Sequence, residues 1–346
     1  MSRVLVRATN WLGDAVMSLP AIRAIRGVFP HAHVAVAARP WVADLYARER
    51  AVDRVIPYPA NPGWSGRREF AARLRAERFD AAILLQNAFD AALLAWMAGI
   101  PERIGYSRDG RRLLLTQPVA VPEPGDIPRH ERFYYLELLR RAGMIEHFPP
   151  SGEIRLDGAQ EARAAGSARM RALAVDGPAL GISPGAAYGN AKRWLPERFA
   201  EAAARLGMAA LIFGSAGERG LCEVVAATVR RAGADARNLA GETTLREFID
   251  LAAACRVFLT NDSGAMHVAA SLGVPTVAVF GATDDTTTGP TGALARVVRE
   301  HAECSPCLLR KCPIDHRCMT RVTSDRVAAA ALELIGETAW THEAKS

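Results

Sequence analysis

The chain has 346 residues, which suits two domains of ~100–200 residues each. Half of the residues are hydrophobic and 23% are charged, the balance of a soluble globular protein with a substantial core, so a low-complexity chain is excluded. A formal net charge of +6 favours anionic partners, without choosing among phosphorylated substrates, nucleic acid and an acidic membrane surface.

Two features bear on location. The longest apolar helix candidate, residues 91–100, is shorter than the ~20 residues that cross a bilayer. Residues 3–7 already have the pattern of a strand, so we expect no signal peptide. The sequence predicts a cytosolic protein that is at most peripheral to a membrane.

In the first half of the chain, short apolar runs alternate with amphipathic stretches, the pattern of βαβ units around a parallel sheet. The predicted strands are residues 3–9, 33–38, 54–58, 81–86 and 103–106. The predicted helices are residues 15–27, 67–77, 88–98 and 130–142. A turn is predicted at 148–152, followed by a helix over 160–174 that crosses between domains.

The second half repeats the alternation. Its predicted strands are residues 179–183, 209–213, 257–260, 276–280 and 295–298, and its predicted helices are residues 196–206, 218–232, 245–254, 265–272 and 325–337. We expect an α/β protein with two doubly wound, Rossmann-like domains facing a central cleft. The expected parts are residues 1–158, a connecting helix over 159–174, residues 175–324, and a last segment, 325–346, for which packing toward the N-terminal domain is one option.

The first predicted strand ends in Asn10-Trp11-Leu12-Gly13-Asp14. Gly13 permits a tight strand-to-helix turn, and Asp14 lies at the carboxyl edge of the sheet, where ligands bind in open α/β folds. A carboxylate there can act as general base if it faces the opposite domain. Alternatively, Asp14 only caps the following helix.

Two loops of the second half carry charged residues after a strand. Ser183-Pro184-Gly185 is followed by Lys192-Arg193, two adjacent cations that can hold a diphosphate or, alternatively, form a solvated basic loop. Gly214 begins a similar strand–glycine–helix turn that ends at Glu218, whose carboxylate can accept hydrogen bonds from a ribose.

A third loop runs from Asn261 to His267, after an apolar strand. Asp262 and Ser263 stand where a helix N-cap belongs, and Gly264 lets the backbone approach another group closely. Such a helix N-terminus suits a phosphate, because its N–H groups and its dipole both favour an anion. An ordinary capped helix is the alternative.

Missing motifs narrow the chemistry. The chain has neither G-x-G-x-x-G nor a P-loop, and it has no Asp-x-Asp to hold a metal on a nucleotide diphosphate. The negative charge of the leaving group would therefore be stabilised by Lys192, Arg193 and the helix N-terminus after Ser263. We expect no cofactor for catalysis.

Four of the six cysteines, Cys304, Cys307, Cys312 and Cys318, lie in one short stretch that also contains His316. Because a cytosolic protein should not rely on disulfides, this density indicates a metal site, with structural zinc as a candidate, or a set of thiols or a redox-dependent disulfide. The spacing differs from that of a standard zinc ribbon.

Taken together, Asn10–Asp14 and Asn261–His267 resemble the ADP-heptose:lipopolysaccharide heptosyltransferases of glycosyltransferase family 9, which have the GT-B fold. Lys192-Arg193-Trp194-x-Pro196, Phe280–Asp284 and the stretch from Cys304 to Cys307 are similar to the heptosyltransferase II group in particular. The resemblance spans essentially the whole chain.

The resemblance implies an inverting transfer of L-glycero-D-manno-heptose from ADP-heptose to the heptosyl-Kdo-lipid A inner core of lipopolysaccharide. It places the acceptor on the N-terminal domain and the donor on the C-terminal domain, with peripheral contact at the cytoplasmic face of the inner membrane. Asp14 matches the family's proposed catalytic base. The implied donor-binding residues are Ser183, Lys192, Glu218, Asp262, Ser263, Gly264 and His267. Ala186 and Ala187 replace hydroxyl residues of some relatives, so a hydroxyl contact to phosphate there is not expected.

The acceptor's Kdo and phosphate groups are anionic, and basic residues of the N-terminal half are suited to pair with them. The candidates are Arg39, Arg129, His130 and Arg132, with a solvated basic surface as the alternative. Two other functions remain open: a non-catalytic nucleotide-sugar-binding module and a family member with another donor or acceptor. A nucleic-acid partner is not expected, because no recognition-helix motif or aromatic RNA platform is present.

Overall fold

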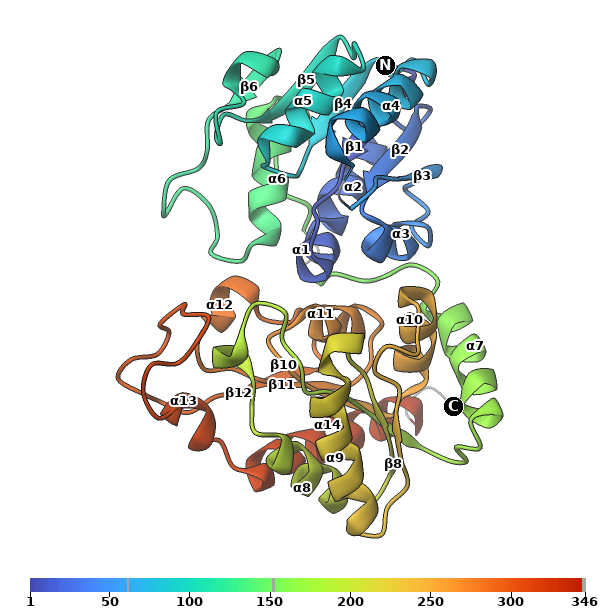
Figure 1. The fold of residues 1–346 in the computed structure, drawn as a ribbon, viewed down its shortest axis with the longest axis vertical. Helices are drawn as coiled ribbons and strands as arrows, with labels where there is room; N and C mark the ends of the chain where they lie inside the picture. The colour runs from blue at the N-terminus through green and yellow to red at the C-terminus, as the bar shows by residue number, and fades with distance from the viewer. Residues whose placement is uncertain (61, 151–152, 344–346) are drawn as a thin grey trace. The chain divides into compact units, whose positions relative to one another are not determined.

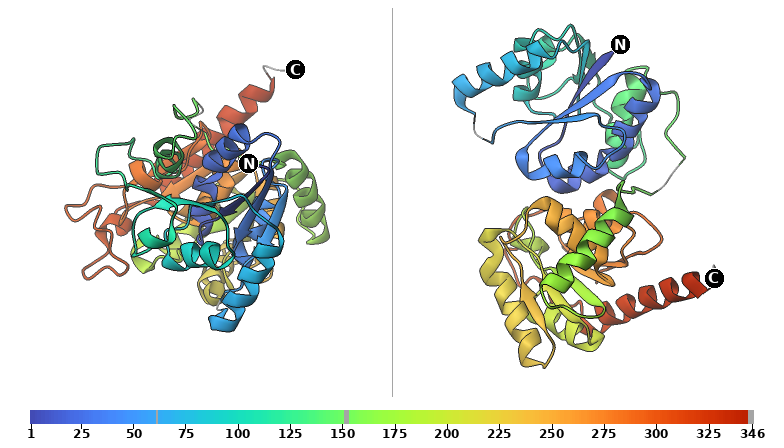
Figure 2. Two further views of the ribbon diagram at one scale, coloured as in Figure 1. Left: turned by 90° about the horizontal axis from the view of Figure 1, so that it is seen from above. Right: turned by 90° about the vertical axis from the view of Figure 1, so that its right-hand side faces the viewer.

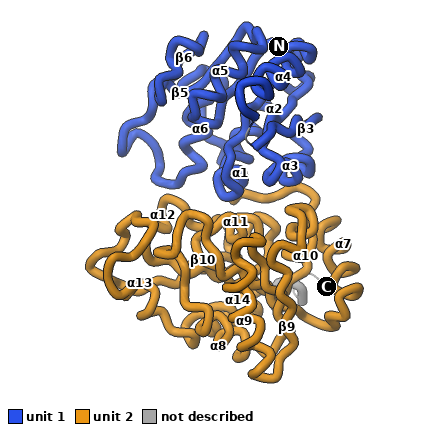
Figure 3. Tube along the Cα trace, viewed as in Figure 1, with its two compact units in different colours: residues 1–151 blue, residues 152–346 orange. Residues whose placement is uncertain are grey.

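A computed structural model describes residues 1–60, 62–150 and 153–343 of the chain. The chain divides into two compact units, residues 1–151 and residues 152–346, which are described separately (Figure 3). Each unit contains one six-stranded sheet in which every strand pair is parallel (Figure 1). The predicted fold class, α/β with two doubly wound parts, is confirmed.

In unit 1 the strands in sheet order are β3 (Arg54–Pro57), β2 (His33–Ala38), β1 (Arg3–Arg7), β4 (Ala81–Leu84), β5 (Glu102–Tyr106) and β6 (Gln117–Val119). The winding reverses between β1 and β4. In doubly wound sheets, the carboxyl ends of the strands at such a switch point border the ligand site. The loops that leave β1 and β4 are therefore the first place to look for function.

Helices cover both faces of this sheet. They are α1 (Leu12–Met17), α2 (Leu19–Val28), α3 (Pro40–Tyr46), α4 (Gly63–Ala76), α5 (Phe89–Met97) and α6 (Arg132–Arg141), with a short 3-10 helix at Arg112–Leu114. Buried side chains of α4 and α5, such as Phe70 and Leu94, join one core cluster with Leu5 and Leu84 of the strands. Because side chains alternate along a strand, Val4 and Val6 point to the other face. Helices α2 and α6 pack against each other.

Unit 2 repeats the same winding with its own six strands. In sheet order they are β12 (Ala295–Val298), β11 (Thr276–Val279), β10 (Val257–Asn261), β7 (Ala179–Ser183), β8 (Ala209–Ile212) and β9 (Ala236–Asn238). Numbered within the unit, both sheets have the order 3-2-1-4-5-6 when read from the appropriate edge. The switch point of unit 2 lies between β7 and β10, so the loops after Ser183 and Asn261 are neighbours.

The longer helices of unit 2 are α7 (Ala159–Ala172), α8 (Pro196–Leu206), α9 (Arg219–Arg231), α10 (Leu245–Ala254), α11 (Gly264–Ser271) and α14 (Ser324–Glu343), and the short ones are α12 (Asp285–Thr288) and α13 (Arg317–Thr320). Side chains of α8, α9 and α14 form one core with alternate residues of the strands. Helix α7 packs against α10. Figure 2 shows α14 as a single straight rod at the end of the chain.

All ten predicted strands are present, and the two that were missed, β6 and β9, are three-residue edge strands. Edge strands this short give no alternation to detect, and Pro118 is compatible with β6 only because an edge strand can spare an N–H. The predicted helix over 15–27 is two helices, α1 and α2. Pro20, in the first turn of α2, marks the new start.

The boundary between the units and the helices α7 and α14 bear on the predicted domains. The predicted boundary was residue 158, whereas the units divide after residue 151. The predicted connecting helix, 159–174, corresponds to α7, which packs on α10 of unit 2. The C-terminal helix α14 contacts α8, β10, β11 and β12. Part of the predicted turn, residues 151–152, lies outside the described residues. Across the described ranges, no helix is long and apolar enough to cross a membrane.

Candidate functional site

The strongest candidate site lies at the switch point of unit 2, where a cation and a carboxylate meet. Lys192 Nζ donates to Asp262 Oδ2 at 2.6 Å, and both side chains are largely buried. Thr283 Oγ1 donates to the same carboxylate oxygen at 2.7 Å. Three loops that are far apart in the sequence therefore converge on one carboxylate, as the strand order β11-β10-β7 requires.

Asn261, which is fully buried at the end of β10, holds these loops in register. Its Oδ1 accepts from Trp194 N at 2.9 Å, and its Nδ2 donates to Pro184 O at 2.8 Å. One amide thus fixes both the turn after β7 and the chain just past Lys192. This arrangement preorganises the cation for a ligand, because the loop that carries it has little freedom left.

The loop after Asn261 differs from the predicted capping. Ser263, rather than Asp262, is the N-cap residue of α11, and its hydroxyl contacts Thr260 Oγ1 at 3.1 Å instead of capping the helix. Gly264 is the first residue of α11. His267 is buried one turn further along. The amide end of α11 therefore opens beside the Lys192–Asp262 pair, an arrangement that suits a phosphate.

Glu218 is held by its own helix start. Its Oε2 accepts from Ser215 N at 2.9 Å and from Ser215 Oγ at 2.8 Å, which makes a capping box. The other oxygen, Oε1, lies 3.6 Å from Arg193 Nη2. A Cβ on Gly185 would overlap this carboxylate, so with any residue other than glycine there the Glu218 side chain would have to shift. The structure brings Glu218, Arg193 and the Ser183 turn together, and the ribose contact remains a prediction.

In unit 1, Asp14 lies in the first turn of α1, at the carboxyl edge beside the switch point, and is partly exposed. Burial, followed by the charge of Asp14, raises the pKa of Glu131. Burial also raises the pKa of Tyr46 to about 12, with Asp14 contributing in the same direction. Glu131 is therefore a close electrostatic neighbour of Asp14 that the sequence did not reveal.

The acceptor candidates lie on the loops around the end of β1. Arg39 precedes α3, donates to Ala60 O at 2.8 Å and stacks on the ring of Tyr58 at 4.3 Å. His130 Nδ1 accepts from Arg132 N at 3.2 Å, and Arg132 is the first residue of α6. His130 and Arg132 flank Glu131, so they belong to the segment that lies near Asp14. Arg129 directly precedes this segment, and its pairing with the acceptor stays a prediction.

A buried arginine beneath this edge was missed. Arg7, at the end of β1, donates to Ala8 O at 2.6 Å and to Asn10 Oδ1 at 3.1 Å, and it lies over the ring of Tyr58. Burial, reinforced by the charge of Arg39, lowers the pKa of Arg7 to about 10. Tyr58 Oη in turn donates to Asp90 Oδ2 at 2.6 Å. An arginine inside an apolar strand offered no sequence signal beyond its unusual place.

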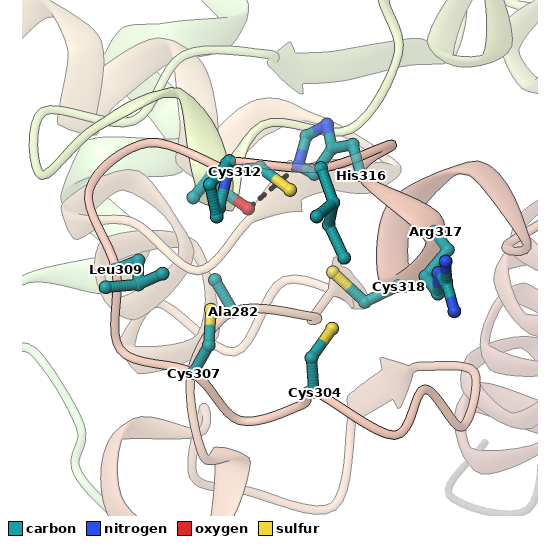
Figure 4. A pocket seen from close by; sticks show the side chains of 11 residues that line it. Ala282, Cys304, Cys307, Leu309, Cys312, His316, Arg317 and Cys318 are labelled. Atoms are coloured by element: carbon teal, nitrogen blue, oxygen red, sulfur yellow. Dashed lines mark hydrogen bonds between the residues drawn. The ribbon is translucent and has the colours of Figure 1, made fainter.

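The four clustered cysteines line a pocket of about 60 Å³ together with His316 and Ala282 (Figure 4). The sulfur atoms are spread around the pocket wall, and the side chains of Cys304 and Cys318 lie on the same side of it. In the described part of the chain, no group of three or more His, Cys, Asp or Glu side chains is placed to hold a metal ion. The expectation of structural zinc at Cys304, Cys307, Cys312 and Cys318 is therefore unsupported, and all four are free thiols.

Comparison with known proteins agrees with this architecture. Residues 67–317 match the family described as "Glycosyltransferase family 9 (heptosyltransferase)". The chain is 34% identical to lipopolysaccharide heptosyltransferase 2 of Escherichia coli K12, over 86% of this chain and 88% of that protein. It is 31% identical to lipooligosaccharide heptosyltransferase 2 of Haemophilus influenzae, with the same coverage. The solved structure of E. coli ADP-heptose lps heptosyltransferase II superposes with a TM-score of 0.82 at 30% identity, covering 98% of this chain and 99% of that one.

Proposed function

The chain belongs to glycosyltransferase family 9 and is a heptosyltransferase of lipopolysaccharide biosynthesis with the GT-B fold, and from this premise we propose its substrates and mechanism. The donor is ADP-heptose, carrying L-glycero-D-manno-heptose, and the acceptor is the heptosyl-Kdo-lipid A inner core. The observation that carries this proposal is the Lys192–Asp262–Thr283 network at the switch point of unit 2, beside the amide end of α11.

The donor diphosphate binds in unit 2. The ammonium group of Lys192 contacts the phosphates. The N–H groups at the start of α11, after Ser263, donate hydrogen bonds that stabilise part of the negative charge of the leaving group. Asp262 holds the ammonium of Lys192 in place before the donor arrives, and Thr283 holds Asp262. Ser183 at the end of β7 and Gly264 and His267 in α11 are proposed to contact the donor as well, and Glu218 is proposed to meet the ribose.

Asp14 acts as general base on the acceptor. It takes the proton of the acceptor hydroxyl while that oxygen bonds to C1 of the heptose, and the bond from C1 to the phosphate oxygen breaks with its electrons leaving on ADP. A single displacement of this kind inverts the anomeric centre. Arg39, His130 and Arg132 are proposed to hold the anionic groups of the acceptor near Asp14.

Catalysis is proposed to need no metal or other cofactor, because Lys192 and the amides of α11 supply the charge that a metal would neutralise. We expect heptose transfer to continue at its full rate in excess EDTA. Loss of activity on chelation, with recovery on adding magnesium, would contradict this part of the proposal.

Contact with the cytoplasmic face of the inner membrane follows from the lipid anchor of the acceptor. The net charge of +6 and the exposed indoles of Trp11, Trp41 and Trp64 in unit 1 support it, because tryptophan and basic residues favour the membrane interface. Sedimentation with vesicles that contain anionic lipid, but not with neutral vesicles, is the expected result.

One experiment tests the function as a whole. The protein is incubated with ADP-heptose and a truncated inner-core acceptor that ends in one heptose, and the product is weighed by mass spectrometry. The expected result is a gain of one heptose and release of ADP. ADP binding without any transfer would identify a non-catalytic nucleotide-sugar-binding module instead, and transfer only from another sugar nucleotide would change the donor.

A further inference from the structure

Residues 303–316 contain three of the clustered cysteines, Cys304, Cys307 and Cys312, and are here named the cysteine arm. The arm returns to the loop that carries Lys192. Arg310 O of the arm accepts from Ala191 N at 3.1 Å, and His316 Nε2 donates to Ala191 O at 2.9 Å. Leu308 O accepts from Tyr188 Oη at 2.9 Å. The arm thus bonds to the residue next to Lys192 from two sides.

Gly189 allows the close approach of the cysteine arm to the loop that carries Lys192. The backbone of Gly189 is extended, so any residue could adopt its conformation. A Cβ at this position, however, would overlap the carbonyl group of Arg310. Glycine is therefore required by the closeness of the arm and not by backbone strain, which indicates that the approach of Arg310 to this loop is a specific feature of the fold.

The other side of the arm is anchored beside Asp262. Ser305 Oγ donates to Gly281 O at 2.6 Å, and Leu308 N donates to Ala282 O at 2.8 Å. The next residue, Thr283, donates to Asp262. The cysteine arm consequently touches the loop that carries Lys192 and the loop that carries Thr283, whose hydroxyl group holds Asp262.

Tyr188 brings a second cation to this pair. The ring of Tyr188 lies 4.9 Å from Lys192 Nζ and 5.1 Å from Arg310 Cζ, both cation–π distances. Among the described residues, no carboxylate is recorded within ion-pair distance of Arg310, which is exposed. Lys192 is neutralised by Asp262, and Arg193 faces Glu218. Arg310 is therefore the uncompensated positive charge beside the pair.

We propose that Arg310 is a donor-binding residue, presented by the cysteine arm to the diphosphate of the nucleotide sugar. A diphosphate carries more negative charge than a lysine already shared with a carboxylate can balance. The guanidinium group binds phosphate oxygens through two parallel hydrogen bonds, and the ring of Tyr188 limits the freedom of its side chain. This inference rests on the proposed site of the donor in unit 2.

The test compares two substitutions of adjacent exposed cations, Arg310→Gln and Lys311→Gln, which change the net charge equally. ADP affinity is measured by calorimetry, and the KM values for ADP-heptose and for acceptor by initial rates. Arg310→Gln is expected to weaken ADP binding and raise the donor KM by about 10- to 100-fold, with the acceptor KM unchanged, as for a lost charge-assisted hydrogen bond. Lys311→Gln should stay within about twofold of the parent.

Two further results guard the interpretation. Arg310→Lys keeps the charge but loses the paired geometry, so it should fall between the parent and Arg310→Gln, and thermal unfolding of each variant confirms that it folds. Equal donor KM values for Arg310→Gln and Lys311→Gln, in a parent that transfers heptose, would overturn the role of Arg310 and leave the proposed function intact. If the parent binds ADP through Arg310 but transfers no heptose, the role of Arg310 is kept and the proposed function is overturned.

Discussion

The two units have the same strand order, yet different kinds of side chain surround their switch points. In unit 2, the carboxyl edge is a closed polar network in which Asp262 is only 5% exposed and already balanced by Lys192. In unit 1, the corresponding edge is open and aromatic, with Trp11 63% and Trp41 49% exposed. There, the carboxylate Asp14 has another acid, Glu131, as its electrostatic neighbour.

This difference fits two tasks. A charged pair that is fixed before the ligand arrives suits a constant group, such as a nucleoside diphosphate, and costs little reorganisation when the leaving group departs. A partly exposed carboxylate at an open edge can be reached by an acceptor hydroxyl group, which a general base requires. In the proposed mechanism, the same strand order supplies a leaving-group site in one unit and a base in the other, and only the loops differ.

The largest effect is expected at Asp14, the proposed base of unit 1. Asp14→Asn preserves the size of the side chain but removes its basicity, so kcat is expected to fall by ~10²–10⁴ while ADP affinity is almost unchanged. Initial rates of heptose transfer and calorimetry with ADP measure both quantities. Glu69→Gln, on an exposed position of α4, is the matched control and should have no effect. A kcat within tenfold of the parent would remove Asp14 from the chemistry.

The next largest effect is expected at Lys192. Lys192→Ala removes a charge-assisted hydrogen bond to phosphate and should weaken ADP binding by roughly 1.5–3 kcal/mol. It also leaves Asp262 buried without its cation, so the free energy of unfolding should fall as well, by about 3 kcal/mol. Calorimetry and denaturant unfolding measure the two losses.

The double variant Lys192→Ala/Asp262→Asn separates these losses. Removing the orphaned carboxylate should restore most of the stability, whereas ADP affinity should remain low. If ADP affinity recovers together with stability, Lys192 supports the fold and does not bind the donor.

A smaller effect is expected on the acceptor side. Arg132→Glu should raise the acceptor KM by about 3- to 10-fold, more at low salt than at high salt, because the pairing with anionic groups is partly exposed and screened. The donor KM should not change. Arg129→Glu makes the same charge reversal on the preceding segment and tests whether the effect belongs to Arg132 in particular. An unchanged acceptor KM would place Arg132 on a solvated basic surface.

The strand pattern predicted the winding of both units, because apolar runs and their spacing are local properties. The sequence also pointed to Lys192 as a cation for a diphosphate and placed Asp262 with Ser263 at a helix N-cap, without showing that Lys192 and Asp262 pair. The partner of Asp262 lies 70 residues away and is chosen by the adjacency of β7 and β10, which no local pattern contains. Thr283 and Arg310 were missed for the same reason.

Glu218 and the cysteines carry a different lesson. Ser215-x-x-Glu218 is a readable capping box, and it shows that one oxygen of Glu218 is already engaged. The cysteine spacing was readable as well, but four thiols in one stretch do not determine whether their sulfur atoms converge on a point or line a cavity. In the structure they line a cavity, and the cysteine arm, which carries three of them, is proposed to act through Arg310.

The smallest expected effect concerns Glu131 and depends on pH. Burial and the charge of Asp14 raise its pKa, so the ionised form of Glu131 is less favourable in the folded protein than in the unfolded chain. The resulting loss of stability is absent below the ordinary glutamate pKa of about 4.3 and grows as pH rises through the higher folded value. Glu131→Gln should therefore raise Tm at neutral pH and leave it unchanged near pH 4.

The substitution also removes a negative charge beside Asp14. The acid limb of kcat/KM should consequently move to lower pH, by less than about one unit, because proton loss from a neighbouring acid then meets less repulsion. If the limb stays in place while Tm rises, Glu131 is a buried acid with no influence on the base. If neither changes, the electrostatic contrast between the two switch points is weaker than their geometry indicates.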